Sequence, residues 1–226
     1  MIIVFDGPDG VGKTTQINLV HSALSKKYNT KIIKMPTEST RKLLGEDISQ
    51  KQKLQALLFD WIDFAYIQTL PDTVYLLDRS PLTSILAYNA QHMNEEEYNW
   101  FIKQCNKYHA LPHPHSPTMY IIFNRNMPYN SKIYDDFENR FNQKWVAETF
   151  MALADGKTYY GKPVYGVYTD IVPMYDKTTS TTSDTHGTTD IDAITLSHFL
   201  TKFLEQKIIN DTGASSFIKN IESCQY

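Results

Sequence analysis

The stretch that decides the fold is Gly7-Pro8-Asp9-Gly10-Val11-Gly12-Lys13-Thr14, which fits the spacing G-x-x-x-x-G-K-[ST] at every defined position. It follows an apolar run, Ile2 to Phe5, and precedes apolar residues at helical spacing. In such a strand–turn–helix context, glycines let consecutive backbone N–H groups point at phosphate oxygens. The partial positive charge of the helix N-terminus adds to that attraction. The sequence therefore predicts a phosphate-binding loop.

Single residues in and near this loop have predictable roles toward a nucleoside triphosphate. We expect the Lys13 ammonium to reach the β- and γ-phosphates of ATP and the Thr14 hydroxyl to hold Mg²⁺. Asp78 ends the apolar run Val74 to Leu77, which predicts a second Mg²⁺ ligand beside the loop. Arg79 follows directly, and its guanidinium can hold phosphate through two hydrogen bonds. Further contacts to the nucleotide are predicted for Gly10, Val11, Gly12 and Thr15.

The rest of the chain alternates between short apolar runs and amphipathic stretches. Strands are predicted near residues 31–35, 74–77 and 119–123, and helices near residues 54–70, 83–90, 95–108, 138–153 and 191–208. Such alternation is typical of an α/β fold, here a three-layer P-loop NTPase fold with a central parallel sheet flanked by helices. We expect one domain over residues 1–208 and a polar C-terminal extension over residues 209–226. The tyrosine-rich residues 159–175 are predicted to hold one or two further short strands.

Composition argues against several classes of function. Hydrophobic residues make up 42% of the 226 residues, which is enough for a full core and excludes a globally disordered chain. The formal net charge of -3 argues against binding of a nucleic-acid polymer or an anionic membrane, since proteins that bind these are usually basic. No apolar run approaches the ~18 residues of a membrane span, and the two cysteines suit a reducing compartment. We therefore expect a cytoplasmic protein without a membrane partner.

The wider stretch Phe5 to Thr15 resembles the phosphate loop of the thymidylate kinase family, usually written [FE]-[ED]-G-x-[DE]-G-x-G-K-[ST]-T. Asp9 is the most telling match, because a generic phosphate loop does not require an acid at that position. Asp78-Arg79-Ser80 resembles the family's D-R-[YHS] signature, and Leu57-Leu58-Phe59 resembles its L-L-F helix segment. The resemblance extends over about residues 1–154.

The resemblance implies a deoxynucleoside monophosphate kinase, which transfers the ATP γ-phosphate to dTMP or to a related or modified pyrimidine nucleotide in nucleotide biosynthesis. The catalytic residues would be Lys13, Arg79, Asp9 and Arg140. Phe59 would stack on the acceptor base, whereas a core aromatic on an apolar helix is the alternative interpretation of this residue. The substrate-binding positions of the family correspond here to Asp9, Glu38, Phe59, Asp63, Arg79 and Tyr88.

Two acidic residues stand where the family carries arginines. Asp63 replaces an arginine that reads the pyrimidine edge, and Glu38 replaces one near the acceptor phosphate. A carboxylate accepts hydrogen bonds, so Asp63 suggests an amino group or a hydroxymethyl group on an altered base. A phage or other viral enzyme, working in the host cytoplasm, would fit this divergence.

The cation that acts in the transition state is expected from a lid over about residues 124–142. The phosphate loop itself carries no basic residue besides Lys13. Candidates in the lid are Arg125, Lys132 and Arg140, of which we favour Arg140 for catalysis, while Arg125 is expected to contact ATP. The resemblance also implies a homodimer formed through helices away from the site, such as the aromatic helix over residues 54–70.

Two other functions remain open from the sequence. A deoxynucleoside kinase phosphorylates a nucleoside hydroxyl and needs a carboxylate base after the second strand. Glu38 could be recruited for that role, although Asp9 argues against it. A catalytically silent nucleotide-binding module would explain the missing arginines as lost chemistry.

Overall fold

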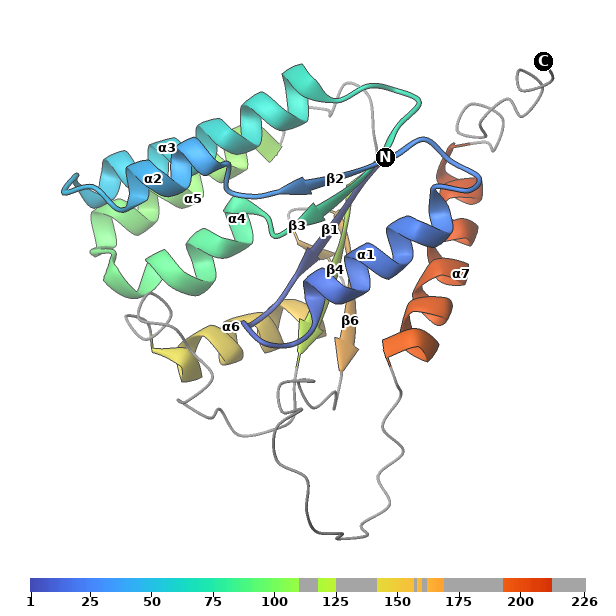
Figure 1. Cartoon of the computed structure of the whole chain (residues 1–226). Coiled ribbons are helices and arrows are strands. Elements are labelled where there is room, and N and C mark those ends of the chain that lie inside the picture. The colour runs from blue at the N-terminus through green and yellow to red at the C-terminus, as the bar shows by residue number, and fades with distance from the viewer. Residues whose placement is uncertain (110–117, 125–141, 157, 160–161, 169–192, 213–226) are drawn as a thin grey trace, which may run out of the picture.

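The computed structural model describes residues 1–109, 118–124, 142–156, 158–159, 162–168 and 193–212 (Figure 1). The strands in these ranges form one sheet with the order β2-β3-β1-β4-β6-β5. Their bounds are Ile2–Asp6 (β1), Thr30–Lys34 (β2), Val74–Asp78 (β3), Thr118–Asn124 (β4), Thr158–Tyr159 (β5) and Lys162–Tyr168 (β6). Strands β2, β3, β1, β4 and β6 run parallel, and the short β5 pairs antiparallel with β6 at the edge.

Helices cover both faces of the sheet, as Figure 1 shows. Their bounds are Lys13–Leu24 (α1), Glu38–Leu44 (α2), Gln50–Ile62 (α3), Pro81–Ser84 (α4), Glu95–His109 (α5), Gln143–Asp155 (α6) and Ala193–Thr212 (α7). Helix α3 continues into a π-helical segment, η1 (Asp63–Gln68), and α4 continues into η2 (Ile85–Asn89) and a 3-10 turn, η3 (Ala90–His92). A parallel sheet with helices on both faces confirms the predicted three-layer α/β fold.

Every residue of β1 is buried, and alternate side chains face opposite layers. Ile2 and Val4 pack into a core that includes residues of α3, α4 and α6. Ile3 and Phe5 pack into a second core that includes residues of α1 and α7. Burial on both faces is typical of a central parallel strand. Since β1 lies between β3 and β4, the loop that follows Asp6 emerges at the middle of the sheet's carboxyl edge.

Two helices in the segment before β3 differ from the sequence prediction. Helix α3 begins at Gln50 rather than Leu54, because Ser49 and Gln52 form a capping box. The Ser49 Oγ accepts the Gln52 N–H at 3.3 Å, and the Gln52 Oε1 accepts the Ser49 N–H at 2.9 Å. The sequence pattern does not predict α2, in which Thr40 is the single buried residue, so its apolar periodicity is too weak to recognise.

Other boundaries also differ. The helix predicted near residues 83–90 is a series of short segments that begins at Pro81, after the N-cap Ser80. Helix α6 begins at Gln143, and residues 138–141 of the predicted helix lie outside the described residues. Helix α7 runs to Thr212, past its predicted end at residue 208 and into the predicted extension. The strands β5 and β6 confirm the prediction for the tyrosine-rich segment as far as Tyr168. Within the part of the chain that the structure describes, no helix is both long and apolar enough to cross a membrane.

Candidate active site

The phosphate loop connects β1 to α1 through three glycines whose backbone conformations favour glycine. The φ angle is +144° at Gly7, +75° at Gly10 and +82° at Gly12. A Cβ atom at Gly7 would overlap the carbonyl oxygen of Phe123 in β4, so this position has no room for a side chain. Gly12 is the N-cap of α1, and Lys13 is the first helical residue. The geometry is thus that of a turn leading into a helix N-terminus, where anions are favoured.

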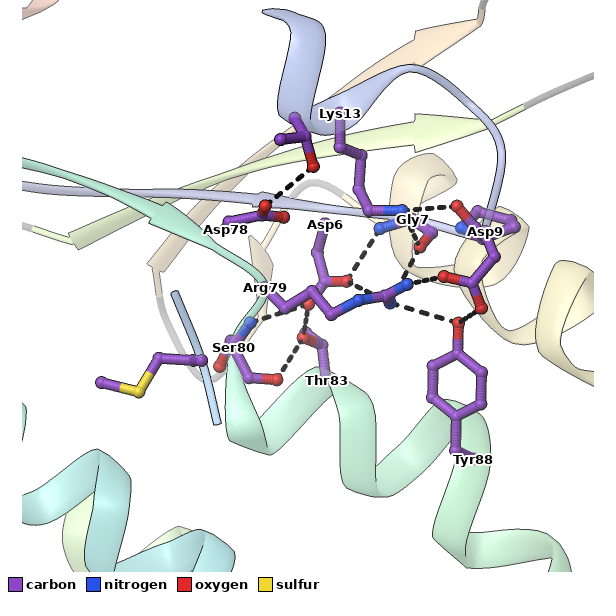
Figure 2. Close-up of polar contacts among 12 residues, drawn as sticks. Asp6, Gly7, Asp9, Lys13, Asp78, Arg79, Ser80, Thr83 and Tyr88 are labelled. Atoms are coloured by element: carbon purple, nitrogen blue, oxygen red, sulfur yellow. Dashed lines mark hydrogen bonds and ion pairs between the residues drawn. The ribbon is translucent and has the colours of Figure 1, made fainter. Parts of the chain in front are cut away.

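The Lys13 side chain points from the start of α1 toward the preceding phosphate loop (Figure 2). Its ammonium donates hydrogen bonds to the carbonyl oxygens of Gly7 at 2.9 Å and Pro8 at 2.5 Å. The residue is only 6% exposed. Away from bulk water, the attraction between an ammonium and an anionic oxygen is stronger. The loop therefore combines turn geometry and a buried cation in the way that a phosphate site requires.

Thr14 and Asp78 meet beside the loop. Strand pairing places Phe5 opposite Asp78, and the Thr14 Oγ1 donates a hydrogen bond to the Asp78 Oδ2 at 2.8 Å. Among the described residues, no group of three His, Cys, Asp or Glu side chains could hold a metal by itself. Mg²⁺ that is bound together with a nucleotide is usually held by one or two protein oxygens and by phosphate oxygens. The hydroxyl and carboxylate of this pair fit such an ion.

Asp9, Arg79 and Tyr88 form a closed ring of polar contacts, shown in Figure 2. The Arg79 Nη2 makes an ion pair with the Asp9 Oδ1, and the Arg79 Nη1 donates to the Tyr88 hydroxyl at 3.1 Å. The Tyr88 hydroxyl in turn donates to the Asp9 Oδ2 at 2.8 Å. The Arg79 guanidinium also lies 5.4 Å from the centre of the Tyr88 ring. Three residues that the sequence assigned to catalysis and substrate binding are therefore brought together at the phosphate loop.

Asp6, the last residue of β1, is a site residue that the sequence analysis missed. Its side chain is fully buried and accepts hydrogen bonds from the Gly7 N–H at 2.8 Å, from the Ser80 N–H at 3.0 Å and from the Thr83 hydroxyl. It also lies 3.7 Å from the Arg79 Nη1. The available signal was a carboxylate at the end of an otherwise apolar strand, directly before the first loop glycine.

The residues predicted to bind the acceptor lie on α2, α3 and η1. Glu38 is exposed at the start of α2. Phe59 on α3 is 67% exposed, so the alternative interpretation of it as a core aromatic is wrong. Asp63 is exposed one turn later, and its N–H donates to the Phe59 carbonyl, which puts both side chains on the same side of the helix. The described contacts do not bring these three residues into the ring around Asp9.

The junction of α2 and α3 is held by one carboxylate. Asp60 on α3 accepts hydrogen bonds from the Thr37 N–H at 2.7 Å, from the Thr37 hydroxyl at 2.9 Å and from the Thr40 hydroxyl at 2.8 Å. Thr37 is the N-cap of α2. Asp60 therefore fixes the start of α2 against α3.

The remaining predicted site residues fall into two groups. Gly10 and Thr15 are exposed, while the Val11 side chain is buried in the second core, so only the Val11 backbone can face a ligand. Arg125, Lys132 and Arg140, and with them almost all of the predicted lid, lie outside the described residues. Their roles stay predictions.

Comparison with curated protein sequences finds one clear relative. The chain is 37% identical over 123 residues to a protein described as a probable thymidylate kinase from Methanobrevibacter smithii. The match covers 50% of this chain and 60% of that relative, so the chain spans less than two thirds of its length. No protein-family model matches the chain.

Comparison with solved structures finds the same kind of fold. The crystal structure of thymidylate kinase from Ehrlichia chaffeensis superposes with a TM-score of 0.52 at 20% sequence identity. The superposition covers 91% of this chain and 98% of that one. At this identity the match establishes the fold alone. By motif, by sequence and by fold, this chain resembles the thymidylate kinases, and the resemblance predicted from its phosphate loop is confirmed.

Proposed function

We propose that this chain is a nucleoside monophosphate kinase, which transfers the γ-phosphate of ATP to the phosphate of a deoxynucleoside monophosphate. The observation that carries the proposal is the ring of Asp9, Arg79 and Tyr88 beside the loop that holds Lys13. A phosphate loop alone would support ATP binding. A cation and an acid held together next to it support a second phosphorylated substrate at the same place.

Phosphoryl transfer requires the residues of the site mainly to align the two substrates and to neutralise negative charge. The acceptor phosphate is already anionic at neutral pH, so no strong general base is needed. Lys13 and Arg79, which both contact the Gly7 carbonyl, offset the negative charge on the transferring group. Thr14 and Asp78 are the residues that would hold Mg²⁺, which supplies further positive charge to the phosphates when it is bound.

The acceptor base is proposed to be thymine or a related or modified pyrimidine. The exposed Phe59 ring is available for stacking, and Asp63 on the same side of the helix offers a carboxylate to hydrogen-bond donors on the base. These two residues support a pyrimidine that carries an amino or hydroxymethyl group. We further propose that Arg140 supplies the transition-state cation and that Arg125 contacts ATP.

Further features of the proposal concern the whole protein. We propose a single kinase domain over residues 1–208, whose last helix α7 continues to Thr212, followed by an extension. We also propose a homodimer and a cytoplasmic location, in a host cell if the chain is of phage or viral origin. Size-exclusion chromatography with light scattering tests the homodimer, and a single species of the monomer mass contradicts it.

The decisive experiment is an assay of ADP release with ATP, Mg²⁺ and each deoxynucleoside or deoxynucleoside monophosphate in turn. We expect turnover with at least one monophosphate and none with nucleosides. Turnover with nucleosides alone would identify a deoxynucleoside kinase instead. Binding of ATP without turnover on any acceptor would identify a catalytically silent module.

A further inference from the structure

We propose that Asp6 is a positioning residue that holds the Arg79 guanidinium and the Gly7 peptide in the orientation used for phosphoryl transfer. The inference rests on the proposed kinase function. In that function, Asp6 contacts neither a substrate nor a metal ion. Asp6 ends β1, and its side chain is fully buried and lies next to Arg79 of the ring formed by Asp9, Arg79 and Tyr88 (Figure 2).

One oxygen of the Asp6 carboxylate contacts the phosphate loop and the arginine together. The Oδ1 accepts the Gly7 N–H at 2.8 Å and lies 3.7 Å from the Arg79 Nη1. The Gly7 carbonyl accepts hydrogen bonds from the Arg79 Nη1 at 3.3 Å and from the Lys13 ammonium at 2.9 Å. Asp6 therefore holds the peptide plane between Asp6 and Gly7, which adjoins the Gly7 carbonyl that both cations of the site share.

The other oxygen holds the backbone around Arg79. Arg79 is a non-glycine residue with a φ of +75°, a conformation that persists only where the surroundings enforce it. Its own N–H donates to the Phe5 carbonyl at 2.9 Å, and the next N–H, that of Ser80, donates to the Asp6 Oδ2 at 3.0 Å. The Thr83 hydroxyl of α4 donates to the same oxygen. Asp6 thus connects the end of β1 with the turn after β3, which contains Arg79, and with α4.

A carboxylate suits this place better than its isosteric amide. The described contacts of Asp6 are three hydrogen-bond donors and one guanidinium, all of which need acceptors. An asparagine would turn an NH₂ group toward one of these donors, since it has one acceptor oxygen where aspartate has two. The amide also lacks the charge that attracts Arg79.

The test compares wild-type protein with Asp6→Asn in a steady-state assay that follows radiolabelled γ-phosphate, which measures slow turnover. We expect kcat to fall about tenfold to hundredfold, because small displacements of a catalytic group are costly. The KM for ATP should change less than about threefold, because the glycines and the helix N-terminus that bind the phosphates remain. Circular dichroism confirms that the variant is folded. A folded Asp6→Asn with wild-type kcat overturns the proposal.

A double variant that includes Arg79→Ala distinguishes a role of Asp6 in positioning Arg79 from a purely structural role of Asp6. If Asp6 acts through Arg79, adding Asp6→Asn to Arg79→Ala should lower kcat by less than about twofold further, since coupled residues are not additive. If Asp6 only supports the fold, the loss should be as large in the Arg79→Ala background as in the wild type. That second result overturns the proposal.

Thr83→Val is a milder variant that keeps the proposal testable if Asp6→Asn does not fold. It removes one hydroxyl donor to Asp6 and should lower kcat about threefold to tenfold, again only when Arg79 is present. The matched control is Thr40→Val, which removes a similar threonine–aspartate hydrogen bond, that to Asp60. The control should lower the melting temperature comparably and leave kcat within about twofold of the wild type. Equal effects of the two variants on kcat overturn the proposal.

The activity of the wild-type protein distinguishes failure of the proposed function from failure of the role proposed for Asp6. Absence of turnover on every monophosphate refutes the proposed function, and the inference with it. Turnover by the wild type together with unchanged kcat in the Asp6 and Thr83 variants refutes the role of Asp6 alone.

Discussion

At the residue scale, Lys13 is the cation that the phosphate loop itself supplies. Its ammonium donates hydrogen bonds to the loop carbonyls of Gly7 and Pro8, and Lys13 is a member of neither hydrophobic core. We expect Lys13→Ala to lower kcat about a hundredfold to a thousandfold, the range for loss of a group that neutralises transition-state charge. The measurement is steady-state ADP release. The control is Lys26→Ala, which changes an exposed lysine just after the end of α1. Near-normal turnover of Lys13→Ala would refute the assigned role.

Tyr88 tests the ring around Asp9 at the same scale. Tyr88→Phe keeps the aromatic ring beside the Arg79 guanidinium but removes the hydroxyl that links Arg79 to Asp9. We expect a loss of about 1 kcal/mol in the free energy of unfolding and a fall in kcat of about tenfold, because both charged groups lose one hydrogen bond. Urea unfolding and steady-state kinetics measure the two effects. A variant with unchanged kcat would show that the hydroxyl does not hold Arg79 for catalysis.

At the element scale, helix α2 depends on a single side chain of α3. Asp60 binds the Thr37 backbone and the hydroxyls of Thr37 and Thr40, while α2 itself buries little apolar surface. We expect Asp60→Ala to lower the free energy of unfolding by about 2–3 kcal/mol, the sum expected for partly exposed hydrogen bonds to a charged acceptor. Urea unfolding measures this, and Asp47→Ala at an exposed position is the control. An equally small change in both variants would contradict the role given to Asp60.

The elements also differ in how far the sequence predicts them. The strands β1, β3 and β4 are short apolar runs, and their buried positions follow from that pattern alone. Helix α2 has no such pattern, because its stability comes from hydrogen bonds to Asp60, about 20 residues further along the chain. The start of α3 was predictable in principle, since Ser49 and Gln52 stand at capping-box spacing.

At the scale of the whole molecule, the second core joins α1, the sheet and α7, and Tyr28 lies within it. Burial raises the pKa of the Tyr28 hydroxyl, and the negative charge of Glu205 on α7 adds to the effect. The folded protein therefore keeps this proton at a pH where the unfolded chain, with a tyrosine pKa of about 10, has lost it. Stability from this source is present below that pH and is lost as the pH rises through the folded pKa.

A comparison of wild-type protein with Tyr28→Phe isolates this contribution. Between about pH 9 and about pH 11, the free energy of unfolding should fall more steeply with pH for the wild type than for the variant, which has no phenolic proton. Urea unfolding at several pH values across this range measures both slopes. Parallel profiles would contradict the raised pKa of Tyr28 in the folded state.

The phosphate loop, the three-layer class and the resemblance to thymidylate kinases can all be recognised from the sequence, because each depends on consecutive residues or on a short hydrophobic period. Which side chains meet at the site follows from the folding of the whole chain. Arg79 lies 70 positions from Asp9, and Asp6 contacts Ser80 across 74 positions, so no local pattern records either pairing. The physical reason is that parallel strands bring distant carboxyl ends to one edge of the sheet, where the ends of β1 and β3 are neighbours.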